Sequence, residues 1–316
     1  MHSAFFINGG AGRTLSSVSA LDTYAKENTK DDFIIVCEGG TDFYKGHPLL
    51  HARAYDVWHK NLFQDLLLTR KILSPEPYRV WEYYNQKCSI GQAYDIEINN
   101  KGIRKLELPQ IFLNKEELIF ARQMIKEVKE KTGKEKVIVF QPFGRMSKNQ
   151  DDNFIDISGR SFEIDNTISL IRQLGKTYAM IIMTESPIDF SKYQINFPVA
   201  NPQGVHVRVW ASVIKQCDHF LGCDSLGQHI AHAFEKTATV VLGSTYPINV
   251  SYPDSPKFHC INMNAEKRIY SPLRITIDET VDRANENAMN MDKEIETKIV
   301  QSVNSFIKHG YKKNKK

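Results

Sequence analysis

The sequence lacks several features that would assign it directly to a class. It has only five cysteines and no CxxC pair, which argues against a disulfide framework or a structural zinc site. No apolar run approaches the roughly 18 to 20 residues that a membrane span requires. The first ten residues, MHSAFFINGG, have neither the basic region nor the long apolar stretch of a signal peptide. We therefore expect reduced thiols, no membrane span and a cytoplasmic location.

Metal-binding acidic motifs are also missing. No Asp-x-Asp motif stands at the end of a predicted strand, and the acidic pair Asp151-Asp152 lies in a polar loop. We expect neither a metal ion nor a resident cofactor.

Positive charge is concentrated at one end of the chain. The formal net charge is +4, and residues 308–316 hold five lysines and no acidic residue. The remainder of the chain is therefore nearly neutral. The basic tail, residues 311–316, is interpreted either as a solubilising extension or as an arm that binds phosphate backbones.

Apolar strands alternate with helical patterns in two successive series. The first series predicts strands at 4–10 and 31–40 and helices at 12–28, 62–73 and 116–132. The second predicts strands at 136–144, 177–186, 219–223 and 237–244, and helices at 165–175, 209–217 and 225–236. Such alternation indicates parallel sheets covered by helices on both faces.

The sequence therefore predicts an α/β protein with two Rossmann-like domains. We place the N-terminal domain at residues 1–133 and the C-terminal domain at 134–290. Residues 291–310 form an amphipathic helical pattern that should pack back on the body. Its apolar face carries Ile295, Ile299, Val303, Phe306 and Ile307.

Glycine-rich and polar segments follow the predicted strands. In open parallel sheets, ligands bind beyond the carboxyl ends of the strands, where helix N-termini also attract anions. The segments are GGAGRT, with Gly10, Gly12 and Arg13, FGRMSK, with Arg145 and Lys148, GCDSLGQH, and GSTYP.

The segment after the 219–223 strand concentrates the most chemistry. Asp224 or Ser225 can cap the next helix, Gly227 permits close backbone approach, and His229 lies in the first turn. Free N–H groups, a hydroxyl and an imidazole would suit a diphosphate. Simple helix capping, with His229 half-buried, is the alternative.

The stretch from residue 219 to 247, HFLGCDSLGQHIAHAFEKTATVVLGSTYP, resembles the C-terminal signature of the heptosyltransferase family, glycosyltransferase family 9. The matching residues are Asp224, Ser225, His229, Ala231, Ala233, Gly243, Thr245 and Pro247. Glu185 stands where the family often has an acid that contacts the nucleotide ribose. The resemblance covers most of residues 135–255 and only loosely 1–60.

This resemblance implies a GT-B fold, with two Rossmann-like domains facing across a cleft. It implies a glycosyltransferase that moves a sugar from a nucleotide-sugar donor to an acceptor hydroxyl, with inversion and without an essential metal. The C-terminal domain would hold the donor and the N-terminal domain the acceptor. The leaving diphosphate could be stabilised by Arg145, Lys148, Ser225 and His229, with Arg13 acting from the facing domain.

Two departures from the family pattern affect the assignment. Leu226 stands where the family has glycine, with Gly227 one place late. Gly12 and Arg13 stand where the family has an aspartate interpreted as the general base.

A base is therefore expected after the second strand. Asp42 is the first candidate, then Glu38, with His47 as a third. Asp42 could instead be a turn residue, and Lys148 could belong to a solvated loop.

Other interpretations remain open. GGAGRT followed by Glu38 resembles a dinucleotide site, although Leu15 replaces the third glycine, so an NAD-type oxidoreductase is one alternative. A catalytically inactive nucleotide-sugar-binding protein is another. The acceptor could be a saccharide or a hydroxylated base in phage DNA. PYRVWEYYNQK, residues 77–87, could stack bases or sugars, or line a core.

Overall fold

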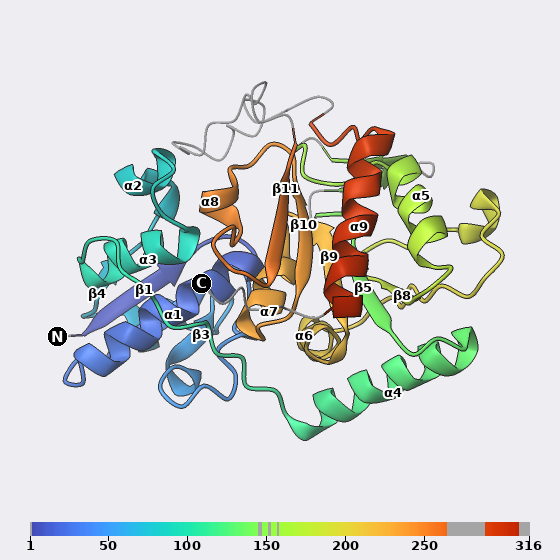
Figure 1. The fold of residues 1–316 in the computed structure, drawn as a ribbon. Helices are drawn as coiled ribbons and strands as arrows, with labels where there is room; N and C mark the ends of the chain where they lie inside the picture. The colour runs from blue at the N-terminus through green and yellow to red at the C-terminus, as the bar shows by residue number, and fades with distance from the viewer. Residues whose placement is uncertain (1, 145–146, 151–152, 157, 264–287, 310–316) are drawn as a thin grey trace. The chain divides into compact units, whose positions relative to one another are not determined.

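The computed structural model describes residues 2–144, 147–150, 153–156, 158–263 and 288–309 (Figure 1). Among these, the residues up to Asn114 form one compact unit and those from Lys115 onward form a second. A parallel sheet lies at the centre of each unit.

The first unit contains a four-stranded parallel sheet in the order β3-β2-β1-β4. Its strands are β1 (Ser3–Ile7), β2 (Ile34–Cys37), β3 (Ala54–Asp56) and β4 (Lys71–Leu73). Helix α1 (Ala11–Glu27) follows β1, and α3 (Ile90–Asn99) packs beside α1. Every residue of β2, one of the two inner strands, is buried, as a continuous apolar strand in a covered sheet requires.

The prediction of a single helix over residues 62–73 is wrong. A π-helical turn covers Leu62–Leu67, and Lys71–Leu73 forms strand β4, which pairs with β1. Between them, Thr69 has a φ of 77°, and a residue in the left-handed region cannot continue a right-handed helix. The apolar side chain of Leu67 still packs against β2, so burial is kept although the helix is not.

The aromatic stretch 77–87 is divided between core and surface. Tyr78 and Tyr83 are buried, with ring centroids 5.4 Å apart in an edge-to-face arrangement. Trp81, in the short helix α2 (Trp81–Tyr84), is 52% exposed, and the Lys87 ammonium lies 3.9 Å from its ring centroid. The core interpretation therefore holds for the two buried tyrosines and not for Trp81.

The compact units divide at Asn114, not at residue 133. Helix α4 (Lys115–Thr132) packs against α6 (Val207–Gln216) of the second unit. The largely buried Arg208 guanidinium pairs with the Glu117 carboxylate at 2.5 Å, and Gln216 Nε2 donates to the Leu118 carbonyl at 3.1 Å. These contacts assign α4 to the sheet that follows it, although the sequence pattern suggested that it closes the first series.

The second unit contains a five-stranded parallel sheet in the order β11-β10-β9-β5-β8. Its strands are β5 (Val137–Gln141), β8 (Ala179–Ile182), β9 (His219–Cys223), β10 (Ala238–Leu242) and β11 (Phe258–Asn262). Helices α5 (Ile164–Leu174), α7 (Leu226–Ala233) and α8 (Pro247–Val250) connect them. An antiparallel hairpin of β6 (Lys148–Gln150) and β7 (Asn153–Ile155) follows β5.

Helix α9 (Lys293–His309) packs on the core of the second unit, as its apolar face predicts (Figure 1). Ile299 and Val303 are fully buried in a cluster shared with β5, β9 and α5. A buried polar ladder reinforces this packing: His219 Nε2 lies 3.0 Å from Thr239 Oγ1, which lies 2.7 Å from Ser302 Oγ.

The buried Glu296 carboxylate supplies a second attachment for α9. It accepts hydrogen bonds from Asn166 Nδ2 at 3.0 Å and Ser169 Oγ at 2.7 Å, both on α5. The basic tail at 311–316 lies outside the described residues.

Candidate functional site

The carboxyl ends of β5, β9 and β10 place three polar segments at one edge of the sheet of the second unit. All three strands run parallel and are neighbours in the order β10-β9-β5. The segment after β9 holds Asp224 and Ser225, the segment after β10 holds Thr245, and the segment after β5 runs to α5. This is the edge at which the sequence predicts donor binding.

Gln141, the last residue of β5, organises the start of α7. Its Oε1 accepts a hydrogen bond from the Gly227 N–H at 2.8 Å, and its Nε2 donates to Ser225 Oγ at 3.1 Å. Ser225 occupies the N-cap position, but its side chain makes no capping hydrogen bond. Side-chain capping by Ser225, the alternative to a functional role, is therefore not what the structure shows.

Gly227 is required by packing against neighbouring side chains. A Cβ atom at this position would lie 2.5 Å from both Gln141 Oε1 and the Phe220 ring. The groups that approach Gly227 closely are the Gln141 and Phe220 side chains, and a role of Gly227 at a donor site stays a prediction.

The Asp224 carboxylate is buried beside α7. Gln228 Nε2 donates to its Oδ1 at 2.9 Å, and a guanidinium nitrogen of Arg160 lies 3.9 Å from its Oδ2. Burial raises the pKa of Asp224, while the Arg160 cation, the Thr245 hydroxyl and Gln228 oppose the rise. Asp224 is therefore an internal anchor for Arg160 and the first turn of α7.

The loop between β7 and α5 presents Arg160 at this edge. Asp156 holds the loop, because its carboxylate accepts hydrogen bonds from the Ser158 hydroxyl and, at 2.5 Å, from Ser161 Oγ. The loop is also tied to the segment after β10, where Ser244 Oγ donates to the Ser158 carbonyl at 2.6 Å. Arg160 was not among the residues predicted from the sequence; the available signal was a guanidinium within the short polar run Ser158–Ser161.

His229 lies in the same region. It is buried, and its Nδ1 lies 2.8 Å from the Tyr252 hydroxyl. Burial and the Arg160 cation lower the pKa of His229 to about 4, so the imidazole is neutral near pH 7. The structure thus brings together Asp224, Arg160, Ser225 and His229.

The other residues predicted to bind the donor make fewer of the contacts described at this edge. Thr245 is buried beside Asp224. Glu185 is exposed in the segment that follows β8, at the same edge of the sheet. Lys148 begins strand β6, and Arg145 lies outside the described residues.

The glycine turn after β1 packs directly on the turn after β2 in the first unit. The Gly9 N–H donates to Glu38 Oε2 at 2.5 Å. A Cβ atom at Gly39 would lie 2.5 Å from the Gly10 carbonyl carbon and 2.8 Å from the Ala11 nitrogen. Gly9 and Gly10 therefore belong to a tightly packed backbone turn that Glu38 holds, whereas Gly12 lies in the first turn of α1.

Arg13 is engaged within the first unit. Its Nε donates to the Tyr94 hydroxyl at 2.9 Å, and its guanidinium pairs with Glu76 at 3.1 Å. It also lies 5.0 Å from the Tyr78 ring centroid. Burial opposes the charged form, but the neighbouring Tyr94, Tyr78 and Glu76 raise the pKa of Arg13. These contacts give Arg13 a structural role in joining α1 to the 76–94 segment.

The candidate bases differ in their surroundings. Asp42 is partly exposed in the turn after β2, where Lys45 Nζ pairs with its Oδ1 at 2.6 Å. His47 is only 2% exposed, and its Nε2 lies 3.7 Å from Asp22 Oδ1. Burial lowers the pKa of His47, opposed by the Asp22 carboxylate. Of these two, Asp42 is the more accessible to an acceptor.

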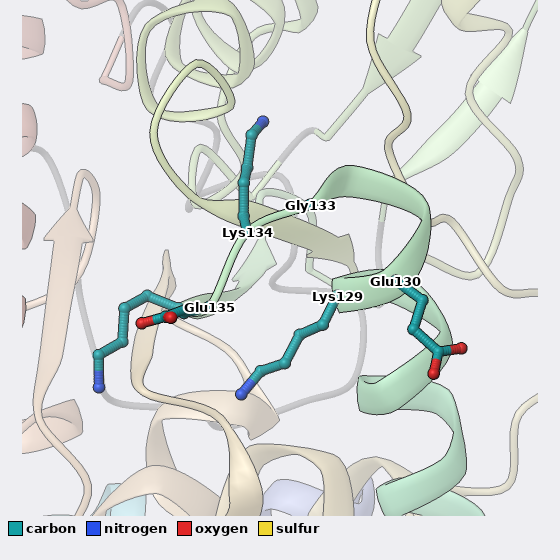
Figure 2. A pocket seen from close by; sticks show the side chains of 6 residues that line it. Lys129, Glu130, Gly133, Lys134 and Glu135 are labelled. Carbon is teal, nitrogen blue, oxygen red and sulfur yellow. The ribbon is translucent and has the colours of Figure 1, made fainter.

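A surface hollow of about 560 Å³ lies elsewhere, beside the end of α4 and the start of β5 (Figure 2). Lys129, Lys134 and Glu135 line it around Gly133. Because Gly133 to Lys136 precede β5, the hollow lies at the amino edge of the sheet, away from Asp224. It is not the predicted donor site.

Two structural absences concern metal ions and membranes. In the described ranges, no group of three or more His, Cys, Asp or Glu side chains is arranged to hold a metal ion. None of the helices in those ranges combines the length and apolar character needed to cross a lipid bilayer.

Comparison with solved structures identifies the fold as GT-B-like. The chain superimposes on a glycosyl transferase of family 9 from Veillonella parvula with a TM-score of 0.69 and 10% identity, over 97% of each chain. It superimposes on the Escherichia coli ADP-heptose lipopolysaccharide heptosyltransferase II with a TM-score of 0.61 and 13% identity, over 92% of this chain and 99% of that one. For the Escherichia coli heptosyltransferase WaaC with ADP, the TM-score is 0.54 and the identity 10%, over 96% of this chain and 100% of that one.

These likenesses span nearly the whole chain at low identity and show its fold. No protein-family profile matches the sequence. No curated protein matches it either.

Proposed function

We propose that this protein is a glycosyltransferase that transfers a sugar from a nucleotide-sugar donor to an acceptor hydroxyl. The observation that carries the proposal is the convergence of Asp224, Arg160 and His229 at the N-terminus of α7. The fold supports it, because two of the similar structures are a heptosyltransferase with ADP and an ADP-heptose heptosyltransferase. The second unit would bind the donor.

The diphosphate would occupy the edge beyond β9 and β10. Breaking the bond between the anomeric carbon and the donor phosphate leaves negative charge on the diphosphate. The Arg160 cation, the Ser225 hydroxyl, the His229 ring N–H and the first backbone N–H groups of α7 would stabilise that charge. Asp224 would hold Arg160 in position. Glu185, exposed after β8, is proposed to contact the nucleotide ribose.

The first unit would supply the base. In an inverting transfer, a carboxylate removes the proton from the acceptor hydroxyl as its oxygen attacks the anomeric carbon. Asp42 is proposed for this step, with Glu38 as the second candidate. Glu38 already accepts from the Gly9 N–H, and this engagement also removes support from the oxidoreductase alternative, in which Glu38 would bind a ribose.

The acceptor is proposed to be a saccharide, with hydroxylated DNA as the second candidate. The exposed Trp81 ring, with the Lys87 ammonium above it, supports DNA as the second candidate acceptor, because nucleic-acid bases stack on such surfaces.

A two-stage experiment tests the proposed function. Thermal shifts with ADP, UDP, GDP and CMP sugars identify the donor, and donor turnover is then measured with lipopolysaccharide and with hydroxymethylated DNA. We expect one donor to raise the melting temperature and one acceptor to stimulate turnover. Donor binding without turnover or hydrolysis would instead identify an inactive binding protein.

The salt dependence of acceptor binding distinguishes the two acceptors. Each cation on a DNA phosphate contributes close to one unit to the slope of log affinity against log salt. If DNA is the acceptor, deleting residues 311–316 should flatten this slope; an unchanged slope returns the tail to a solubilising role.

A further inference from the structure

We propose that Tyr252 is a positioning residue that sets the tautomer of His229, so that His229 presents its Nε2–H to the donor diphosphate. This inference rests on the proposed function for its ligand. The observation that carries it is the contact between the Tyr252 hydroxyl and His229 Nδ1, which are 2.8 Å apart with the rings nearly perpendicular at 87°.

The direction of this hydrogen bond follows from the chemistry of the two groups. A phenol is a stronger donor than acceptor, and the unprotonated nitrogen of a neutral imidazole is a strong acceptor. Burial and the Asp224 carboxylate raise the pKa of Tyr252, so its hydroxyl stays protonated. The hydroxyl therefore donates to Nδ1, which places the single ring proton of His229 on Nε2.

The ring of His229 is then available on its other side. The His229 Nδ1 atom pairs with the Tyr252 hydroxyl. Its Nε2 atom makes no hydrogen bond to any residue that the structure describes. Arg160 lies close enough for its cation to lower the pKa of His229. An anion at this position would meet a guanidinium and a neutral N–H donor together.

An aromatic cluster fixes the tyrosine itself. The His232 ring stacks on the Tyr252 ring, with centroids 3.4 Å apart and planes 14° apart. Phe258 contacts the same tyrosine edge-to-face at 5.1 Å. The His232 and Phe258 rings thus hold the Tyr252 ring, and the Tyr252 hydroxyl lies within hydrogen-bond distance of His229 Nδ1.

The test combines a tautomer measurement with kinetics. Tyr252→Phe keeps the ring contacts and removes the hydroxyl. Long-range ¹⁵N–¹H correlation spectra of the full chain should show the Nε2–H form of His229 in the wild type and a mixture of both tautomers in the variant. The kcat for turnover of the nucleotide sugar should fall about tenfold in Tyr252→Phe, with little change in the affinity for that sugar. The reason is that only part of the population then carries the His229 proton on Nε2.

Two further variants separate positioning from folding. Phe258→Leu loosens the same cluster but keeps the hydroxyl, so it should lower the melting temperature and leave the tautomer unchanged. In a His229→Gln background, adding Tyr252→Phe should have no further effect on kcat, because a glutamine amide has no tautomer to select.

Retention of the pure Nε2–H form and of wild-type turnover in Tyr252→Phe would overturn the inference. A wild-type protein that neither binds nor turns over any nucleotide sugar would overturn the proposed function instead. The tautomer measurement does not need activity, so it would still support or overturn the role of Tyr252.

Discussion

Asp224 contributes to the candidate site through the groups that it holds. Its carboxylate is buried between Gln228 and Arg160, so a substitution acts on the arginine and on α7 together. A sequence pattern can mark such an acid but cannot distinguish a residue that touches the ligand from one that orients the residue touching it.

Asp224→Asn removes the charge and keeps a side chain that can still bond to Gln228. We expect the melting temperature to change little and donor turnover to fall by roughly 10²- to 10³-fold, because Arg160 loses its ion pair with Asp224. Asp254→Asn, at an exposed acid of the same unit, is the control and should be silent. Wild-type turnover in Asp224→Asn would remove this edge from the mechanism.

Asp42→Asn tests the proposed base. Turnover should fall by roughly 10²- to 10⁴-fold with donor binding retained, because an amide cannot take the acceptor proton. Lys45→Gln breaks the same ion pair but leaves the carboxylate, so it should keep most of the activity. If Lys45→Gln is equally damaging, Asp42 serves the turn; if Asp42→Asn and Glu38→Gln both turn over normally, the base lies elsewhere.

Gly227→Ala tests the packing at the start of α7. The new methyl group would meet Gln141 and Phe220 at 2.5 Å, so we expect a loss of about 1 to 3 kcal/mol in the free energy of unfolding, measured by urea titration. At Gly102 a Cβ atom would find open space, and Gly102→Ala should be neutral or slightly stabilising. Equal stability of the two variants would show that the Gln141 contact is not restrictive.

At the residue scale, sequence patterns located the edge but not all of its members. Asp224, Ser225 and His229 stand in a spaced motif after a clear strand, so they could be predicted. Arg160 follows a short hairpin without periodicity, and only the tertiary contact with Asp224 reveals it. Arg13 was expected at a ligand because it follows a glycine turn, whereas Tyr94 and Glu76, distant in sequence, engage it.

Helix α9 illustrates an element whose attachment depends on protonation state. His219 bridges Thr237 and Thr239 in the interior, and its ring stacks on Phe306 of α9. Burial lowers the pKa of His219 to about 3, while a histidine in the unfolded chain titrates near 6.5. The folded state therefore requires the neutral ring.

The pH dependence of stability follows from this shift. The neutral His219 ring makes its full contribution to the free energy of unfolding above about pH 6.5. This contribution is lost as the pH falls toward 3, because the histidine of the unfolded chain takes up a proton at a higher pH than the buried ring does. At pH 5 one such histidine costs about 2 kcal/mol. Urea titrations from pH 7.5 to 4.5 should show this decline, with a smaller slope in His219→Gln and an unchanged slope in the exposed control His59→Gln. Identical slopes in all three proteins would exclude His219 as the cause.

At the element scale, the sequence predicted the burial of side chains better than the backbone conformation. The apolar pattern of residues 62–73 predicted a helix, and Leu67 from this segment is buried. The type of element was wrong because the backbone at Thr69 adopts a left-handed conformation that hydrophobic periodicity cannot report. In contrast, β5 and β9 were predicted well, since a continuous apolar strand in a covered sheet leaves little choice.

The whole chain is expected to work without added metal. In the proposed function, Arg160, the α7 N-terminus and the His229 N–H would provide the positive potential that a divalent cation could otherwise supply to a diphosphate. Donor turnover measured with excess EDTA should therefore equal turnover in its absence. Complete loss with recovery on adding Mn²⁺ would contradict this expectation.

At the molecular scale, the boundary at Asn114 could not be obtained from periodicity. Helix α4 ends at a glycine before a strand, which resembles the close of a domain, and its burial against α6 is a tertiary fact. The alternating series nevertheless predicted two parallel sheets, because a continuous apolar strand followed by a helical pattern can be recognised from the local sequence.

The attachment of α9 also bears on the order in which the chain matures during synthesis. Ser302 and Glu296 provide partners for buried groups on β10 and α5, which are made much earlier. The second unit therefore cannot complete its interior until Lys293–His309 have left the ribosome, whereas the sheet of the first unit has all its strands once Leu73 has emerged. A nascent chain stalled before α9 would carry a finished first sheet and an open second core, which chaperones would have to shield.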